Sequence, residues 1–130
     1  MNQFLFVYGT LMQGQSLEGY LAGLSSRPAR AQGQLFRLPA GYPALAQNNK
    51  DEWVHGELVS LPSMSRLTVL DMVEGVNKGL FSRKKIPVQL SNQKLQAWAY
   101  VMSLRKIESL GGQPIPSGDW CTVSYASPQQ

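Results

Sequence analysis

The sequence predicts an α+β protein whose sheet curls into a small barrel. Short runs of aromatic and β-branched residues recur along the chain, which is typical of strands. One clear helical pattern extends from Pro62 to about Glu74. The run 95–102 carries apolar side chains on both faces, with Trp98 and Tyr100 on one face and alanines on the other. Both faces of this strand are therefore expected to be buried, as a curled sheet requires.

The N-terminal third of the chain predicts one buried strand and one short helix. Residues 3–8 form an apolar run that Gly9 ends, which indicates a central strand followed by a tight turn. Residues 16–24 predict a helix with Ser16 as its cap and four apolar side chains on one face.

The middle of the chain predicts two further strands and a loop. Residues 29–38 alternate loosely and stop at Pro39, as an exposed or bent strand would. A loop is expected from Pro39 to Pro43. Residues 53–59 form the next strand, in which Gly56 predicts a bulge.

The helix at 62–74 carries the candidate catalytic group. At 100° per residue, Glu74 lies between Leu67 and Leu70 in projection, on the stripe that the helix buries. Gly75 follows in the position of a C-cap glycine. Burial and the helix dipole both disfavour a negative charge at this end, so the pKa of Glu74 is expected to rise toward neutral pH. A general acid or base needs such a pKa.

The last third of the chain predicts a β-hairpin and a short helix. Strands 80–90 and 95–102 flank a polar turn, and a short helix near Arg105 follows. The basic run 83–85 is interpreted as a solvated strand edge rather than a substrate contact.

Length and composition predict one globular domain, residues 1–130. The 130 residues can bury one core, and 43% hydrophobic with 15% charged residues excludes a disordered chain. One cysteine and one histidine exclude an internal disulfide and the usual zinc spacings, so we expect no structural metal site.

No targeting segment and no transmembrane run is expected, which favours a cytoplasmic protein without a membrane partner. The net charge of +4 would suit an anionic partner but also simply favours solubility, and it does not decide between them. The sequence does not indicate an oligomeric state.

Two segments together outline a site. A turn after the first strand can present free backbone N–H groups to an anion, and Glu74 can move a proton. Taken alone, residues 8–11 favour a simple strand followed by a turn, and Glu74 taken alone favours a partly solvated helix end; the function rests on the two segments together. The candidate residues of the turn are Tyr8, Gly9, Thr10 and Leu11.

Five short motifs in order resemble the γ-glutamylcyclotransferase-like family, which includes γ-glutamylamine cyclotransferases and AIG2-like proteins. Residues 8–11 (YGTL) are similar to its YGSL/YGTL motif, and residues 70–75 (LDMVEG) to its LDxxEG. Residues 81–83 resemble its aromatic-x-Arg, residues 97–101 its late aromatic strand, and residues 117–120 its SGDW. The resemblance covers about residues 4 to 120 and implies a small mixed β-barrel with a few flanking helices.

The resemblance also implies a reaction without a cofactor. The α-amine of a γ-glutamyl group attacks its own γ-carbonyl and releases 5-oxoproline with a free amine or amino acid. Glu74 would then be the proton shuttle, residues 8–11 would bind the α-carboxylate through backbone N–H groups, and Tyr100 would line the site. Phe81 stands where some relatives carry tyrosine, and Thr10 replaces serine. Because Phe81 lacks this hydroxyl, the identity of the group on the far side of the γ-glutamyl bond is left open: a peptide, glutathione, a lysine side chain or an antibiotic intermediate.

Two other functions are weighed against this one. A non-catalytic protein that binds a small anion or metabolite would keep the turn at residues 8–11 but show no turnover. A nucleic-acid binder would need exposed aromatic residues among basic ones, whereas the aromatic residues here lie in apolar runs, so no nucleic-acid partner is expected.

Overall fold

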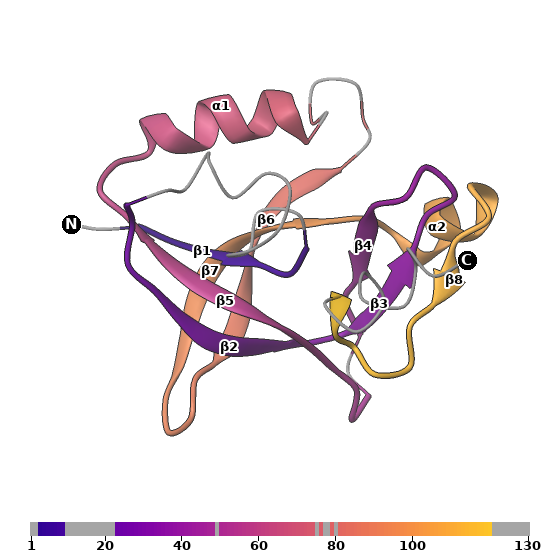
Figure 1. Cartoon of the computed structure of the whole chain (residues 1–130), viewed down its shortest axis with the longest axis horizontal. Helices are drawn as coiled ribbons and strands as arrows, with labels where there is room; N and C mark the ends of the chain where they lie inside the picture. Colours follow the sequence, from indigo (N-terminus) through magenta and orange to yellow (C-terminus); the bar gives the residue numbers. More distant parts are fainter. Residues whose placement is uncertain are drawn as a thin grey trace.

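The computed structural model describes residues 3–9, 23–48, 50–74, 76, 79 and 81–120. Within these ranges the chain forms strands and two helices, which confirms the predicted α+β class (Figure 1). The elements are β1 (Gln3–Val7), β2 (Ser26–Gln32), β3 (Gln34–Arg37), β4 (Pro43–Ala46), β5 (Trp53–Leu61), α1 (Ser65–Val73), β6 (Ser82–Gln89), β7 (Lys94–Val101), α2 (Leu104–Ser109) and β8 (Gln113–Pro114).

The larger sheet has the order β1-β5-β2-β6-β7 and is closed. Neighbouring strands are antiparallel except at the closure, where β7 pairs with β1 in parallel through Leu5 and Trp98. The predicted hairpin is β6 and β7, paired from Ser82 opposite Val101 to Gln89 opposite Lys94. As expected for a curled sheet, both faces of β7 contribute buried side chains near its end, including Ala99 and Tyr100.

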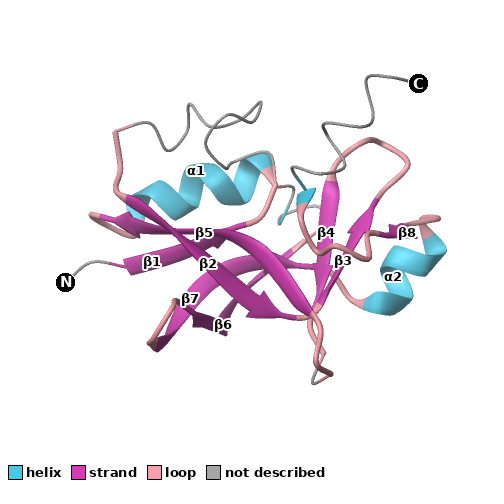
Figure 2. Ribbon diagram, turned by 60° about the horizontal axis from the view of Figure 1, so that its bottom comes forward, coloured by secondary structure: helices cyan, strands magenta, loops and turns pink. Residues whose placement is uncertain are grey.

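A smaller sheet of order β4-β3-β8 lies at one end of the closed sheet, beside α2 (Figure 2). The run 29–38, predicted as one bent strand, is in fact two strands separated at Gly33: β2 belongs to the larger sheet and β3 to the smaller one. The Gly33 N–H donates to the Glu52 carbonyl at 3.0 Å, which holds the chain where it changes sheet. The predicted loop ends earlier than expected, because Pro43 is the first residue of β4.

Two details of the predicted elements are corrected. Helix α1 begins at Ser65 rather than at Pro62, and Glu74 is its C-cap residue. Gly56 forms no bulge, since β2 and β5 stay in register across it, with Ala29 opposite Gly56. The predicted helix at 16–24 falls almost entirely outside the described residues, as does Gly75.

Buried apolar side chains from both sheets and both helices form one cluster, which includes Leu5, Leu45, Leu70 and Ile107. The helices described here are all too short to cross a lipid bilayer.

Candidate functional site

The end of β1 is fixed by the hydroxyl group of Tyr8. This side chain is buried, and its hydroxyl donates to the Tyr100 carbonyl at 2.6 Å while accepting the Leu45 N–H at 3.2 Å. Burial, and then the nearby charge of Glu74, raise the pKa of Tyr8 well above its ordinary value. Tyr8 is therefore a neutral phenol that ties β1 to β7 and β4.

Gly9 follows Tyr8 in a position where no side chain fits. A Cβ atom placed on Gly9 would lie 2.2 Å from Cγ of Pro43, so the turn and the start of β4 are in close contact. Gly9 is buried, and its N–H makes no hydrogen bond to another described residue. Such an N–H is suited to an anion acceptor. Thr10 and Leu11 lie outside the described residues, so their part in the anion site stays a prediction.

Glu74 lies one residue beyond α1, on the face of the helix that carries Leu67 and Leu70. Its N–H donates to the Leu70 carbonyl at 2.9 Å, which keeps Glu74 in the helical turn. The side chain is partly buried rather than pointing into open solvent. Burial raises the pKa of Glu74 from its ordinary value of 4.5 to about 7. The charge of Glu74 also contributes to the raised pKa of both Tyr8 and Tyr100, which places the three groups near one another.

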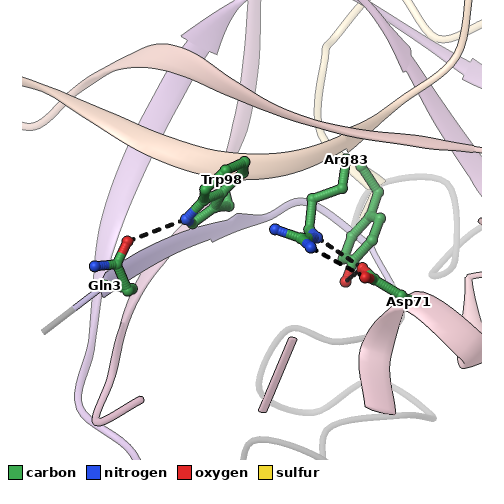
Figure 3. A network of polar contacts seen from close by, with 5 residues as sticks. Gln3, Asp71, Arg83 and Trp98 are labelled. Atoms are coloured by element: carbon green, nitrogen blue, oxygen red, sulfur yellow. Dashed lines mark hydrogen bonds and ion pairs between the residues drawn. The ribbon is translucent and has the colours of Figure 1, made fainter. Parts of the chain in front are cut away.

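Asp71 connects the last turn of α1 to the β6–β7 hairpin (Figure 3). Its Oδ1 accepts Arg83 Nε and the Tyr100 hydroxyl, each at 2.8 Å, and its Oδ2 accepts an Arg83 Nη at 3.1 Å. Arg83 and Tyr100 lie directly opposite each other in the hairpin. Burial, and then the hydrogen bond to Asp71, raise the pKa of Tyr100.

The interpretation of Arg83 as a solvated strand edge is wrong. Its guanidinium forms an ion pair with Asp71 and lies 4.7 Å from the ring centroid of Trp98, and only 23% of its side chain is exposed. The neighbouring Lys84 and Lys85 are exposed, as expected. Sequence alone missed both Arg83 and Asp71 as members of the site. The available signal was the place of Asp71, three residues before Glu74 and therefore on the same helix face.

Phe81 is buried immediately before β6, and its ring centroid lies 6.1 Å from that of Tyr42. The segment 42–45 therefore meets three predicted site residues: Tyr42 is beside Phe81, Pro43 is against Gly9, and Leu45 binds the Tyr8 hydroxyl. Sequence reasoning missed this segment, because Tyr42 and Pro43 fall within the predicted loop and residues 44–45 fall within no predicted element. The structure thus brings Tyr8, Gly9, Glu74 and Tyr100 together, with Phe81 joined to them through the segment 42–45.

This arrangement offers two chemical capabilities. A carboxyl group with a pKa near 7 can both accept and return a proton at neutral pH. Gly9 directly follows Tyr8, whose position is fixed by its hydrogen bonds, and the N–H of Gly9 can contribute to binding an anionic group.

The chain is similar in sequence to a described protein family and to two named relatives. Residues 5–122 match the model of the family described as gamma-glutamyl cyclotransferase, AIG2-like. A Vibrio cholerae protein named "Putative gamma-glutamylcyclotransferase" is 32% identical over 130 residues, covering 93% of this chain and 97% of that protein. The gamma-L-glutamyl-butirosin B gamma-glutamyl cyclotransferase of Niallia circulans is 35% identical over 104 residues, covering 75% of this chain and 65% of that enzyme.

Solved structures show the same fold. The crystal structure of YkqA from Bacillus subtilis superposes with a TM-score of 0.77 at 26% identity; the match covers 100% of this chain but only 44% of YkqA. The AIG2-like protein from Mus musculus superposes with a TM-score of 0.64 at 22% identity, over 78% of this chain and 77% of that protein.

Proposed function

The chain belongs to the gamma-glutamyl cyclotransferase, AIG2-like family, and from this premise we propose that it releases 5-oxoproline from a γ-glutamyl amine or peptide. The observation that carries the proposal is Glu74, a partly buried carboxyl group whose pKa is raised to about 7 by burial. Its charge contributes to the raised pKa of Tyr8, at the end of β1, and of Tyr100 in β7.

The proposed reaction is an intramolecular acyl transfer. Glu74 takes a proton from the α-ammonium of the substrate, and the neutral amine nitrogen attacks the γ-carbonyl carbon to form a five-membered ring. The attacking nitrogen then loses a second proton to become the lactam N–H. The original amide C–N bond breaks, and the leaving nitrogen takes up one proton from Glu74 and a second from solvent, so that it departs as an ammonium. Because the nucleophile and the electrophile belong to one molecule, the protein mainly has to hold the substrate folded and relay protons between the two nitrogen atoms. No cofactor is needed for these steps.

The remaining site residues are assigned to substrate binding. The N–H groups of residues 8–11 would bind the α-carboxylate, which is supported by buried Gly9, whose N–H makes no hydrogen bond to another described residue. Tyr100 would face the γ-glutamyl group, next to Glu74. Phe81 and its neighbour Tyr42 would contact the leaving group. An apolar ring at Phe81 favours a leaving amine with apolar surface over one that needs a hydrogen-bond acceptor there.

The function is tested by incubating the protein with γ-glutamyl dipeptides, glutathione, γ-glutamyl-ε-lysine and a γ-glutamylated aminoglycoside, and measuring 5-oxoproline by mass spectrometry. Release from at least one compound, with one amine formed for each 5-oxoproline, is the expected result. Saturable binding of these compounds without any release would instead support the non-catalytic metabolite-binding function.

The pH dependence of turnover should report the pKa of Glu74. Only the carboxylate form can accept the proton, so kcat/KM should fall about tenfold for each pH unit below about pH 7. The pH at which kcat/KM begins to fall is set by the raised pKa of Glu74, about 7, rather than by the pKa of an ordinary glutamate. Initial rates of 5-oxoproline release across buffers from about pH 5 to pH 8 measure it. A profile that stays flat down to about pH 5 would show that the working base has an ordinary carboxyl pKa.

A further inference from the structure

Helix α1, whose C-cap residue is Glu74, buries few of its described side chains. Among the described side chains of α1, the buried ones are Leu67 and Leu70, while Val69 and Met72 are 51% and 71% exposed. The N-terminal cap of α1 has no side-chain hydrogen bond. A helix with so little buried apolar surface depends on other contacts to hold its position.

Asp71 provides such contacts with both strands of the hairpin. Its carboxylate binds two nitrogen atoms of Arg83 in β6 and the hydroxyl of Tyr100 in β7. A bidentate pair with a planar guanidinium fixes orientation as well as distance. Because Asp71 and Glu74 are three residues apart on one helix face, whatever orients Asp71 also orients Glu74.

Tyr100 extends this connection to the anion-binding turn. Its hydroxyl donates to Asp71, and its backbone carbonyl accepts the Tyr8 hydroxyl, which in turn accepts the Leu45 N–H. One residue of β7 thus contacts both the helix that carries Glu74 and the residue that precedes Gly9.

We propose that Asp71, held by Arg83 and Tyr100, is a positioning residue that keeps the Glu74 carboxyl group sheltered and at a set distance from the end of β1. This inference builds on the proposed function, in which Glu74 moves the proton. Loss of the Asp71 contacts would let the helix end move away from the hairpin, exposing Glu74 to water and displacing it from the substrate. A displacement of about 1 Å can slow a positioned reaction by roughly 100-fold.

The position of Glu74 can be followed without any substrate through its own titration. The described ionisable groups that Glu74 influences are Tyr8, at the end of β1, and Tyr100 in β7, and the ion pair of Asp71 and Arg83 adjoins Tyr100. A variant that changes the net charge of this group would shift the pKa of Glu74 whether or not Glu74 moved. The double variant Asp71→Asn/Arg83→Gln removes the ion pair while leaving the net charge unchanged.

The test measures two quantities for the double variant. The first is the Glu74 titration midpoint, from ¹³C NMR of glutamate carboxyl carbons with Glu74→Gln used for assignment. It should fall from about 7 in the wild type toward 4.5. The second is 5-oxoproline release from the panel compound that the wild type turns over fastest. Here kcat should fall by about 10- to 100-fold, with KM changed by less than about threefold.

Arg30→Gln is the matched control. Arg30 also lies over a tryptophan, 4.1 Å from the ring centroid of Trp53, but forms no ion pair with a described carboxylate. Its substitution should leave both the Glu74 midpoint and kcat unchanged.

A folded double variant that keeps the Glu74 midpoint within about 0.3 pH units of wild type would overturn the inference. If the double variant does not fold, the Glu74 titration midpoint is measured in Tyr100→Phe, which removes one hydrogen bond to Asp71 without altering charge. An unchanged Glu74 midpoint in Tyr100→Phe would also overturn the inference. If the wild type releases no 5-oxoproline from any panel compound, the proposed function fails, and the NMR midpoints still decide the role of Asp71.

Discussion

Replacing Glu74 with glutamine should remove turnover and, above neutral pH, stabilise the protein. The amide matches the carboxyl group in shape but cannot accept a proton, and loss of a positioned base typically lowers rates by about 10²- to 10⁴-fold. The variant should still bind its γ-glutamyl substrate. Both effects are measured on the same preparation, by 5-oxoproline release and by thermal melts.

The stability effect follows from the raised pKa of Glu74. Burial raises this pKa from 4.5 to about 7, so folding disfavours the carboxylate form. The contribution of protonated Glu74 to the free energy of unfolding is fully present below about pH 4.5, and it is lost as the pH rises through about 7. The shift corresponds to roughly 3 kcal/mol at most, so Glu74→Gln should be more stable than wild type by up to that amount at about pH 8 and nearly equal to it at about pH 4.

A structural Glu74 would give the opposite pattern. If hydrogen bonds to the carboxylate held the fold together, the glutamine variant would have a lower melting temperature than wild type at about pH 8. Its free energy of unfolding would be lower by about 1 to 3 kcal/mol. Melts of both proteins at the two pH values separate these outcomes, whatever substrate the enzyme uses.

Replacing Gly56 with alanine should destabilise the fold more than any surface substitution. A Cβ atom at this position would lie 2.1 Å from the Val7 carbonyl oxygen and 3.0 Å from Cζ of Phe6. The first contact is with backbone, so it can be relieved only by separating β5 from β1. Overpacking of this kind costs about 1 to 3 kcal/mol, and we expect the upper end. The melting temperature should fall by roughly 10 °C.

The neighbouring exposed residue supplies the control for Gly56→Ala. His55 lies on the same strand, and His55→Ala removes no packed group, so its melting temperature should stay within about 2 °C of wild type. A Gly56→Ala protein as stable as the control would show that β1 and β5 do not approach each other as closely as described here.

The parts of the fold that the sequence predicted well are those with local periodic signals. The hairpin of β6 and β7 follows from two alternating runs around a polar turn. The partly buried position of Glu74 follows from helical projection against Leu67 and Leu70. Both depend on residues close together in the chain, where side-chain direction is set by the element itself.

The parts that were missed depend on contacts between distant segments. The smaller sheet is built from short strands, including the two-residue β8, and no periodic pattern exists in so short a segment. Pro43 predicted a loop, but it is the first residue of β4, a position at which a strand tolerates the missing N–H of proline. Asp71 was missed because helical spacing can place it on the same face of α1 as Glu74 but cannot show that Arg83 and Tyr100 from the hairpin meet it there.

The central claim is that Glu74 moves the proton in ring closure, and the most direct test is the ratio of kcat for 5-oxoproline release between wild type and Glu74→Gln. The measurement uses the panel compound that the wild type turns over fastest, at about pH 7.5, where most Glu74 is ionised. A ratio of about 100 or more, with the variant folded and still binding the compound, is the predicted result. A ratio within about threefold is less than the loss of any positioned base allows, and would contradict the claim.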